Sequence, residues 1–276
     1  MTPARVSVVI PAYNNAKVIG ETIDSVLAQT GVELELIVAD HSSTDGTKAV
    51  LDRYQDDPRV TILETPAGGG APRNWNRVTA EATGDYVKLV CGDDVLRPGV
   101  LARQAALLER TGAVFTACRR DIVDADSKVL FRGWGLRGIG KPMPGSEAVK
   151  RVVRSGSNQF GEPASVMMRT SVLREAGDWF DRFPYLIDQA SYSRVLMRGD
   201  FVPDTEVGAT FRMSTTQWSV ALVKDQATQA HQYHQWMHDT YPDAVSRTDV
   251  VFGNLRASLM SRARRLSYKV LERRMR

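Results

Sequence analysis

The sequence has 276 residues but only two cysteines, Cys91 and Cys118, and both lie in apolar stretches. So few cysteines exclude a disulfide framework and indicate reduced thiols in a cytoplasmic protein. No apolar stretch approaches the roughly 18 residues that a membrane-spanning helix needs. The first residues also lack the long apolar core of a secretory leader, so we expect none.

The excess of positive over negative charge is confined to one segment. Residues 256–276 hold eight of the 36 Lys and Arg and one of the 32 acids, which gives that segment a net charge of +7. Residues 1–255 keep 28 bases and 31 acids, a net charge of −3, although the whole chain carries +4. An acidic body argues against nucleic acid as a partner. With 43% hydrophobic and 25% charged residues, the composition is that of a globular protein.

A phosphate-binding P-loop is also missing. The Gly-rich stretch at residues 66–74 reads P-A-G-G-G-A-P-R-N and lacks the Gly-Lys-Ser/Thr that completes that motif. It leads instead to Arg73 at the start of an expected helix. The guanidinium of Arg73 could bind a phosphate or orient an acid, or it could form a surface salt bridge.

Short β-branched stretches alternate with amphipathic stretches in the first 111 residues. The spacing of the apolar residues predicts strands at 5–11, 34–40, 59–63 and 86–91. It predicts helices at 18–29, 45–54, 74–83 and 98–111. Strand–helix alternation with short connections is typical of right-handed βαβ units in a parallel sheet.

The second half is less regular. We predict strands at 113–122, 128–131 and 164–168, with edge strands at 200–202 and 208–213. We predict helices at 146–154 and 191–197, and a Gly/Pro-rich loop at 132–145. From residue 216 the pattern is helical almost to the end, with a break near Pro242. The sequence therefore predicts one α/β domain with a helical C-terminal extension.

Two adjacent acids, Asp93 and Asp94, directly follow the fourth predicted strand and precede a Pro-Gly turn. Open α/β sheets bind ligands at the carboxyl ends of their strands. Adjacent carboxylates repel each other there unless a cation, such as a divalent metal on a phosphate, lies between them. The alternative is that both acids simply begin a turn.

Two other strand ends carry groups that suit a nucleotide. Pro11 ends the first strand, and Tyr13 offers a ring that can stack on a base or merely cover the sheet edge. Asp40 ends the second strand, where its carboxylate could accept a hydrogen bond from a pyrimidine imide. These ends would meet Asp93 and Asp94 at the same edge of a parallel sheet.

Four segments follow one another in a recognisable order: V-S-V-V-I-P-A-Y-N-N, I-V-A-D-H-S-S-T-D-G-T, A-P-R-N-W-N and C-G-D-D-V-L-R-P-G-V-L. In this order they resemble the family 2 glycosyltransferases over roughly residues 5–215. The resemblance implies the GT-A fold, an α/β architecture whose Rossmann-like mixed sheet is flanked by helices. It implies a GT-A domain at 1–215, with a nucleotide-binding half at 1–111 and an acceptor-side half at 112–215, and a helical extension at 216–276.

The resemblance also implies roles for individual residues. The nucleotide-sugar would be held by Pro11, Tyr13, Asp40, His41, Arg73 and Asp93. Asp94 would ligate Mn²⁺ or Mg²⁺ on the donor diphosphate. Asp188, at the start of a predicted helix, would be the general base that takes the proton of the acceptor hydroxyl; otherwise it caps that helix. Glu162 is the second candidate for the base.

Two positions depart from the family pattern. His41 stands where many members have a second acid. The identity of the donor's nucleotide base therefore stays open, with UDP- and dTDP-sugars favoured. Cys91 stands where many members have an acid two residues before Asp93. These departures keep a non-catalytic nucleotide-sugar-binding subunit as an alternative. A nucleotidyltransferase is less favoured, because residues 12–15 (A-Y-N-N) replace the Gly-rich basic loop that a triphosphate needs.

The expected reaction is the inverting transfer of one sugar to a hydroxyl of a saccharide or lipid-linked acceptor, in bacterial polysaccharide or glycoconjugate synthesis. Processive synthesis is disfavoured, because residues 232–236 (Q-Y-H-Q-W) lack the Arg of the Q-x-x-R-W signature. Three histidines recur on one helical face, at His231, His234 and His238. A partly solvated surface is favoured there over a metal site.

The basic C-terminal segment is amphipathic. Its apolar residues lie near helical spacing, with Arg and Lys between them, at Phe252, Leu255, Leu259, Leu266 and Val270. Such a helix could bind the anionic inner face of a membrane through residues 252–276. Alternatively, it docks on the body with a solvated basic face.

Overall fold

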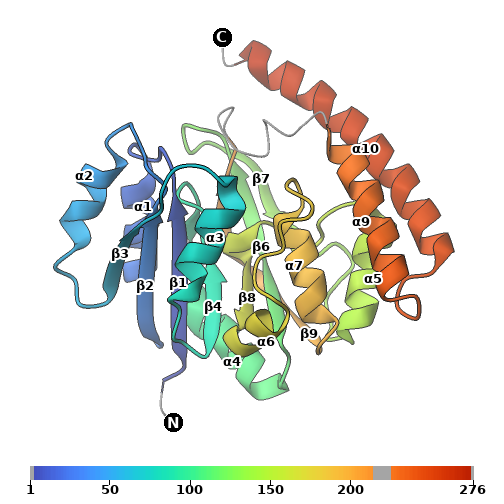
Figure 1. Ribbon diagram of the computed structural model, residues 1–276, viewed down its shortest axis with the longest axis horizontal. Coiled ribbons are helices and arrows are strands. Elements are labelled where there is room, and N and C mark those ends of the chain that lie inside the picture. The colour runs from blue at the N-terminus through green and yellow to red at the C-terminus, as the bar shows by residue number, and fades with distance from the viewer. Residues whose placement is uncertain (1–2, 214–224, 275–276) are drawn as a thin grey trace.

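A nine-stranded mixed sheet forms the centre of the computed structural model (Figure 1), which describes residues 3–213 and 225–274, with side chains as far as residue 261. Its strands are β1 (Arg5–Ala12), β2 (Glu33–Asp40), β3 (Val60–Glu64), β4 (Tyr86–Leu89), β5 (Val95–Leu96), β6 (Phe115–Val123), β7 (Val129–Trp134), β8 (Val166–Arg169) and β9 (Phe201–Arg212). Their order is β3-β2-β1-β4-β8-β6-β9-β5, and β7 pairs with β6. The predicted α/β mixed sheet is confirmed.

Strand direction brings several strand ends to one side of the sheet. β1 to β4 run parallel, as the βαβ pattern predicts. β8 runs antiparallel to both β4 and β6, so β4 and β6 point the same way, and β9 is parallel to β6. The carboxyl ends of β1, β2, β4, β6 and β9 therefore share one side, which we call the carboxyl edge.

Helices bury both faces of this sheet. They are α1 (Ile19–Leu27), α2 (Thr47–Leu51), α3 (Gly70–Ala80), α4 (Val100–Thr111), α5 (Gly145–Ser155), α6 (Thr170–Glu175), α7 (Ile187–Leu196), α9 (Gln226–Thr240) and α10 (Arg247–Arg274), with short 3₁₀ helices η1 (Asp52–Tyr54) and η2 (Pro163–Ser165). In β1, Val8 and Ile10 pack in one core with α1 and α4, whereas Val9 packs in the other with α3 and α7. Alternate side chains of a strand face opposite sides, so a strand covered on both faces is apolar throughout.

The two C-terminal helices pack against each other, and α10 also packs on α5 at the side of the sheet (Figure 1). His234 on α9 is buried, and its Nδ1 lies 2.8 Å from Asn254 Oδ1 on α10. His231 Nε2 lies 3.1 Å from Ser258 Oγ. His231 and His238 are half-buried, as expected for a partly solvated face, while the buried His234 joins His231 in linking the two helices.

Two kinds of feature are missing from the part of the chain that the structure describes. No three side chains of His, Cys, Asp or Glu come together there in a group that could hold a metal ion by themselves. None of the helices within those residues has the length and apolar character needed to cross a membrane.

The second half departs from the sequence prediction in detail. Residues 201–212 form the single strand β9 inside the sheet rather than two edge strands. The polar residues that interrupt its apolar pattern lie at a register shift in the pairing with β6, and Asp204 is buried in an ion pair with Arg103 (Nε–Oδ2 2.9 Å). The short elements β5 and α6 were not predicted, since so few residues show no periodicity. The predicted helical start at residue 216 lies outside the described residues.

Candidate active site

The acidic pair Asp93–Asp94 follows β4 at the carboxyl edge, and its two members differ in burial. Asp94 is fully buried, and its Oδ1 accepts a hydrogen bond from the backbone N–H of Arg212 (3.1 Å). Its Oδ2 has no hydrogen-bond partner among the described residues. Asp93 is only half-buried. Of the two carboxylates, Asp93 is therefore the one within reach of solvent.

Burial raises the pKa of the Asp94 carboxyl well above its usual range, and the neighbouring charge of Asp93 raises it further. Desolvation disfavours the charged form of a carboxyl, and a like charge nearby adds to this. A bound cation would reverse the balance by stabilising the carboxylate. The pair thus favours either a shared proton or a positive ion beside it.

Arg212, at the end of β9, fixes the backbone around the pair. Its side chain is buried, and its Nε donates to the carbonyl oxygen of Asp93 (3.1 Å). Its Nη2 donates to Glu21 of α1 (2.7 Å), and its Nη1 donates to Ser127 in the turn between β6 and β7 (2.7 Å). No sequence motif marks Arg212, because the pairing of β9 with β5 and β6 brings it here.

Asp188 lies in the first turn of α7 and is half-buried. Its Oδ2 accepts a hydrogen bond from Asn158 Nδ2 (2.8 Å), and its Oδ1 accepts one from the backbone N–H of Gln189 (2.7 Å). Burial raises the pKa of Asp188 to about 7, with a smaller contribution from the charge of Glu162. The N-cap position of α7 belongs to Leu186, so Asp188 does not cap the helix. A carboxyl with this pKa is suited to accept a proton near neutral pH.

Glu162, the second candidate for the base, forms an ion pair with Arg120. Arg120 is buried on β6, and its Nη2 donates to Glu162 Oε1 (3.1 Å) while its Nε contacts Oε2. A Cβ at Gly135 or Gly161 would lie 2.7 or 2.6 Å from Arg120 Nη1, so both glycines leave room for the guanidinium. A carboxylate neutralised in this way is a poor general base, which favours Asp188.

The residues predicted to hold a nucleotide base lie at the ends of β1 and β2. Tyr13 is 59% exposed, and its ring meets that of His41 edge-on, with 6.0 Å between centroids. His41 is buried, and its Nε2 lies 2.9 Å from the carbonyl oxygen of Gly68. The Asp40 carboxylate is also buried and accepts hydrogen bonds from the N–H and Oγ of Ser43. Tyr13 is thus free to stack on a ligand, whereas Asp40 already has internal partners.

Asn74 ties this part of the carboxyl edge together. It is buried, and its Nδ2 donates to the carbonyl oxygens of Ala39 (2.9 Å) and Ala12 (3.3 Å), at the ends of β2 and β1. Its Oδ1 accepts from Thr65 Oγ1 (2.6 Å), just after β3. The adjacent Arg73 is exposed and donates to the carbonyl oxygen of Ala67 (3.1 Å), which keeps its guanidinium over the Gly-rich loop. The positioning role of Asn74 was not predicted from the sequence.

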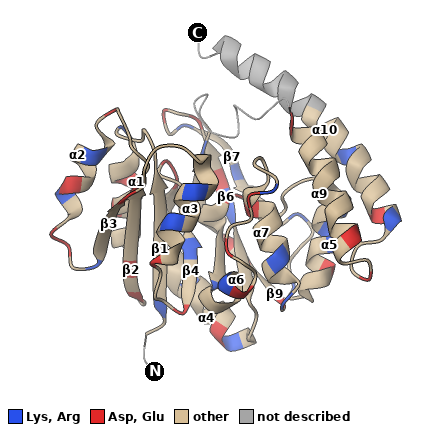
Figure 2. Cartoon of the chain, in the orientation of Figure 1, with Lys and Arg blue, Asp and Glu red and all other residues tan. Residues whose placement is uncertain are grey.

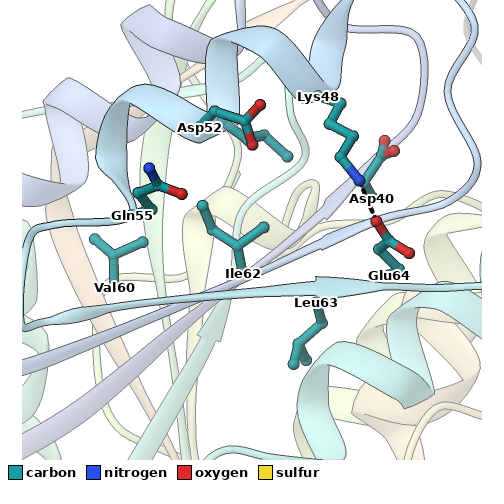
Figure 3. A pocket seen from close by; sticks show the side chains of 9 residues that line it. Asp40, Lys48, Asp52, Gln55, Val60, Ile62, Leu63 and Glu64 are labelled. Carbon is teal, nitrogen blue, oxygen red and sulfur yellow. Dashed lines mark hydrogen bonds and ion pairs between the residues drawn. The ribbon is translucent and has the colours of Figure 1, made fainter.

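A cavity of about 400 Å³ opens beside this edge, between α2, η1 and β3 (Figure 3). Its lining includes Lys48, Gln55 and Glu64, and Lys48 forms an ion pair with Glu64 across it. Among the residues predicted to bind the donor, the cavity reaches Asp40. It therefore adjoins the candidate nucleotide side and is separate from Asp188.

The structure brings the predicted catalytic groups close to one another. Burial raises the pKa of the Cys91 thiol most, and the charges of Asp93, Asp94, Glu162 and Asp188 raise it further, which indicates that all four acids lie near Cys91. β1 lies between β2 and β4, so Tyr13, Asp40 and His41 lie on the same carboxyl edge as the acidic pair. The predicted residues converge from both halves of the chain.

The family model described as "Glycosyl transferase family 2" matches residues 7–177. The chain belongs to glycosyl transferase family 2. The putative glycosyltransferase EpsE of Bacillus subtilis is 29% identical over 175 residues, covering 62% of this chain and 58% of EpsE. The chain thus matches little more than half of that relative's length.

Two solved structures resemble this protein in fold. S. aureus TarS (residues 1–349) in complex with UDP-GlcNAc aligns with a TM-score of 0.65 and 18% identity, covering 85% of this chain and 67% of that one. The mannosyltransferase PcManGT from Pyrobaculum calidifontis, in complex with GDP-Man and Mn²⁺, aligns with a TM-score of 0.61 and 16% identity, covering 98% and 81%. The GT-A fold that the sequence predicted is confirmed.

Proposed function

We propose that this protein is an inverting glycosyltransferase that moves one sugar from a nucleotide diphosphate-sugar to an acceptor hydroxyl. The observation that carries the proposal is Asp188, a half-buried carboxyl with a pKa of about 7, oriented by Asn158 and close to the acidic pair. Asp188 takes the proton of the hydroxyl as that oxygen attacks the anomeric carbon, while the diphosphate leaves from the opposite side. The acceptor is a saccharide or lipid-linked glycan in bacterial polysaccharide or glycoconjugate synthesis.

The donor binds along the carboxyl edge in this proposal, with residues 1–111 supplying the nucleotide side and 112–215 the acceptor side. The nucleotide base stacks on the exposed ring of Tyr13, next to Pro11, Asp40 and His41. The guanidinium of Arg73 contacts the phosphates. The TarS and PcManGT complexes contain UDP-GlcNAc and GDP-Man, which supports a nucleotide-sugar donor. We favour a UDP- or dTDP-sugar.

The acidic pair suits Mn²⁺ or Mg²⁺, both of which prefer oxygen ligands and keep water and phosphate oxygens in their shells. Asp93 reaches solvent, and the buried Oδ2 of Asp94 lacks a partner among the described residues. We therefore assign Asp93 as the ligand that faces the donor and Asp94 as the carboxylate behind it. This proposal differs from the expectation drawn from the sequence, in which Asp94 ligates the ion and Asp93 holds the nucleotide-sugar. When bound, the metal neutralises charge that develops on the departing diphosphate. PcManGT was solved with Mn²⁺.

The test is a panel of UDP-, dTDP- and GDP-sugars, assayed for metal-dependent transfer or donor hydrolysis with wild type and Asp188→Asn. Turnover in wild type and its loss in Asp188→Asn support the proposal, with Asp181→Asn, an exposed acid in the preceding loop, as the matched control. Equal activity of wild type and Asp188→Asn contradicts it. Donor-dependent thermal stabilisation without any turnover would identify a non-catalytic binding subunit instead.

A further inference from the structure

Helix α10 turns its large apolar side chains away from the protein. Val251, Phe252, Leu255 and Leu259 are between 44% and 66% exposed. With 3.6 residues per turn, these four positions fall within an arc of about 100° on one side of the helix. We call these four residues the apolar stripe of α10.

The opposite side of α10 packs on α5 and α9 through the core residue Val250 and otherwise through small and polar residues. Gly253, Ala257 and Ser261 are buried there, and Asn254 bonds to the histidines of α9. A Cβ on Gly253 would lie 2.3 Å from the carbonyl oxygen of Val153 in α5, so close helix contact requires glycine at this position. The helix is therefore docked mainly through this side, and Phe252, which contacts Arg154 of α5, is the member of the apolar stripe nearest to the docking surface.

The charge around the apolar stripe is positive. Arg256 is exposed in the middle of the stripe's length. The guanidinium of Arg154 lies 5.6 Å from the centre of the Phe252 ring, but it is paired with the buried Asp249 (Nε–Oδ1 3.4 Å), so the excess positive charge comes from Arg256 and from the sequence after it. The sequence that follows, residues 262–276, adds seven Lys or Arg and one Glu. Elsewhere on the visible elements, acidic and basic residues are interspersed (Figure 2).

We propose that the apolar stripe of α10 docks the protein on an anionic membrane surface. An exposed apolar face beside Arg256, followed in the sequence by a segment rich in Arg and Lys, matches the lipid interface, where apolar side chains enter the acyl boundary and cations meet the headgroups. A second copy of this chain fits less well, because two α10 helices would bring two segments of net charge +7 together. This proposal does not depend on the sugar-transfer reaction.

The test measures co-sedimentation of the full chain with vesicles of phosphatidylcholine alone and of phosphatidylcholine mixed with phosphatidylglycerol. The variant is Leu255→Gln with Leu259→Gln, which keeps good helix formers at two exposed positions. The matched control is Phe131→Gln with Trp134→Gln, which removes the exposed aromatic pair of β7. Thermal unfolding of each variant checks that the fold is unchanged.

We expect wild type and the control to bind the mixed vesicles, with binding that weakens as salt is added. The partition coefficient of the Leu255/Leu259 variant should fall at least about tenfold, since each lost apolar side chain weakens insertion. Failure of wild type to bind, equal binding to both vesicle types, or equal loss in both variants would overturn the proposal. So would dimerisation in sedimentation velocity that the Leu255/Leu259 variant abolishes without any vesicle binding. None of these readouts requires turnover, so failure here leaves the transferase proposal standing.

Discussion

The nucleotide side and the catalytic side of the candidate site are built in different ways. On the nucleotide side, Tyr13 and Arg73 are exposed at a strand end and a helix start. On the catalytic side, Asp188 is surrounded by buried or paired groups from distant segments, among them Asn158 and the Arg120–Glu162 ion pair. A binding residue needs accessible surface, whereas a general base needs surroundings that raise its pKa.

Asp188→Asn should have the largest effect, and it tests whether the catalytic side acts separately from the nucleotide side. We expect kcat to fall by about 10²–10⁴-fold, because the acceptor hydroxyl loses its general base. The donor Kd should change little, since Asp188 lies on the catalytic side. Steady-state kinetics and donor thermal-shift titrations measure the two quantities. A parallel loss of donor affinity would show that the two sides are not separate.

The raised pKa of Asp188 also predicts two pH effects. Because the carboxyl must be ionised to act as a base, kcat should rise with pH and level off above about 7. The pKa of Asp188 in the folded state lies above its unfolded value near 3.9, so the folded state binds the proton more tightly. The stability that this group contributes is therefore lost as pH rises from about 4 to about 7. Compared with wild type, Asp188→Asn should therefore gain Tm as pH rises through that window. A Tm difference that is independent of pH would count against the raised pKa.

Arg120→Met tests the support of the catalytic side. Removing one partner of a buried ion pair leaves an uncompensated charge, and we expect the free energy of unfolding to fall by about 3–5 kcal/mol. Urea unfolding measures this, with Glu162→Gln as the milder comparison. The released charge of Glu162 should also move the pH midpoint of kcat upward. A loss below about 1 kcal/mol would mean that the pair behaves like a surface salt bridge.

Asp93→Asn and Asp94→Asn test which of the two carboxylates is the principal ligand of the metal ion. If Asp93 faces the donor, its replacement should raise the Mn²⁺ concentration for half-maximal activity by at least about tenfold, as loss of a carboxylate ligand weakens binding. Asp94→Asn should have the smaller effect, because that residue is buried behind it. Titration of activity with Mn²⁺ gives both values. The opposite order would favour Asp94 as the principal ligand.

Tyr13→Ala should have the smallest effect and act on binding alone. Stacking of an aromatic side chain on a base contributes about 1–3 kcal/mol, so the donor KM should rise about tenfold while kcat stays near the wild-type value. The ring is 59% exposed, so the fold should not suffer. A fall in kcat instead of a rise in KM would place Tyr13 on the catalytic side.

How well the sequence predicted a feature depended on how local that feature is. The first four strands and the helices between them follow from apolar spacing, and the strand ends carrying Asp40 and Asp93 follow from that pattern. Arg212 and the Arg120–Glu162 pair were missed, because their partners are far away in the chain. The differing burial of Asp93 and Asp94 was missed for the same reason, since Arg212 helps to create it.

The C-terminal helix shows the same limit. Its sequence predicts an amphipathic helix whose apolar residues suit either docking on the body or binding to a membrane. In the structure Gly253 and Ala257 dock instead, because a helix pair that approaches closely has room only for small side chains, and Leu255 and Leu259 remain exposed.

By itself, the sequence determined the alternation of strands and helices and the identity of the family 2 motifs, because periodicity and strand-end chemistry are local properties. The tertiary structure decided which carboxyl has a pKa of about 7, which acid of the pair reaches solvent, and which face of α10 is left uncovered. Burial and charge–charge distances depend on segments that meet only after folding, and those two quantities set the chemistry of this site.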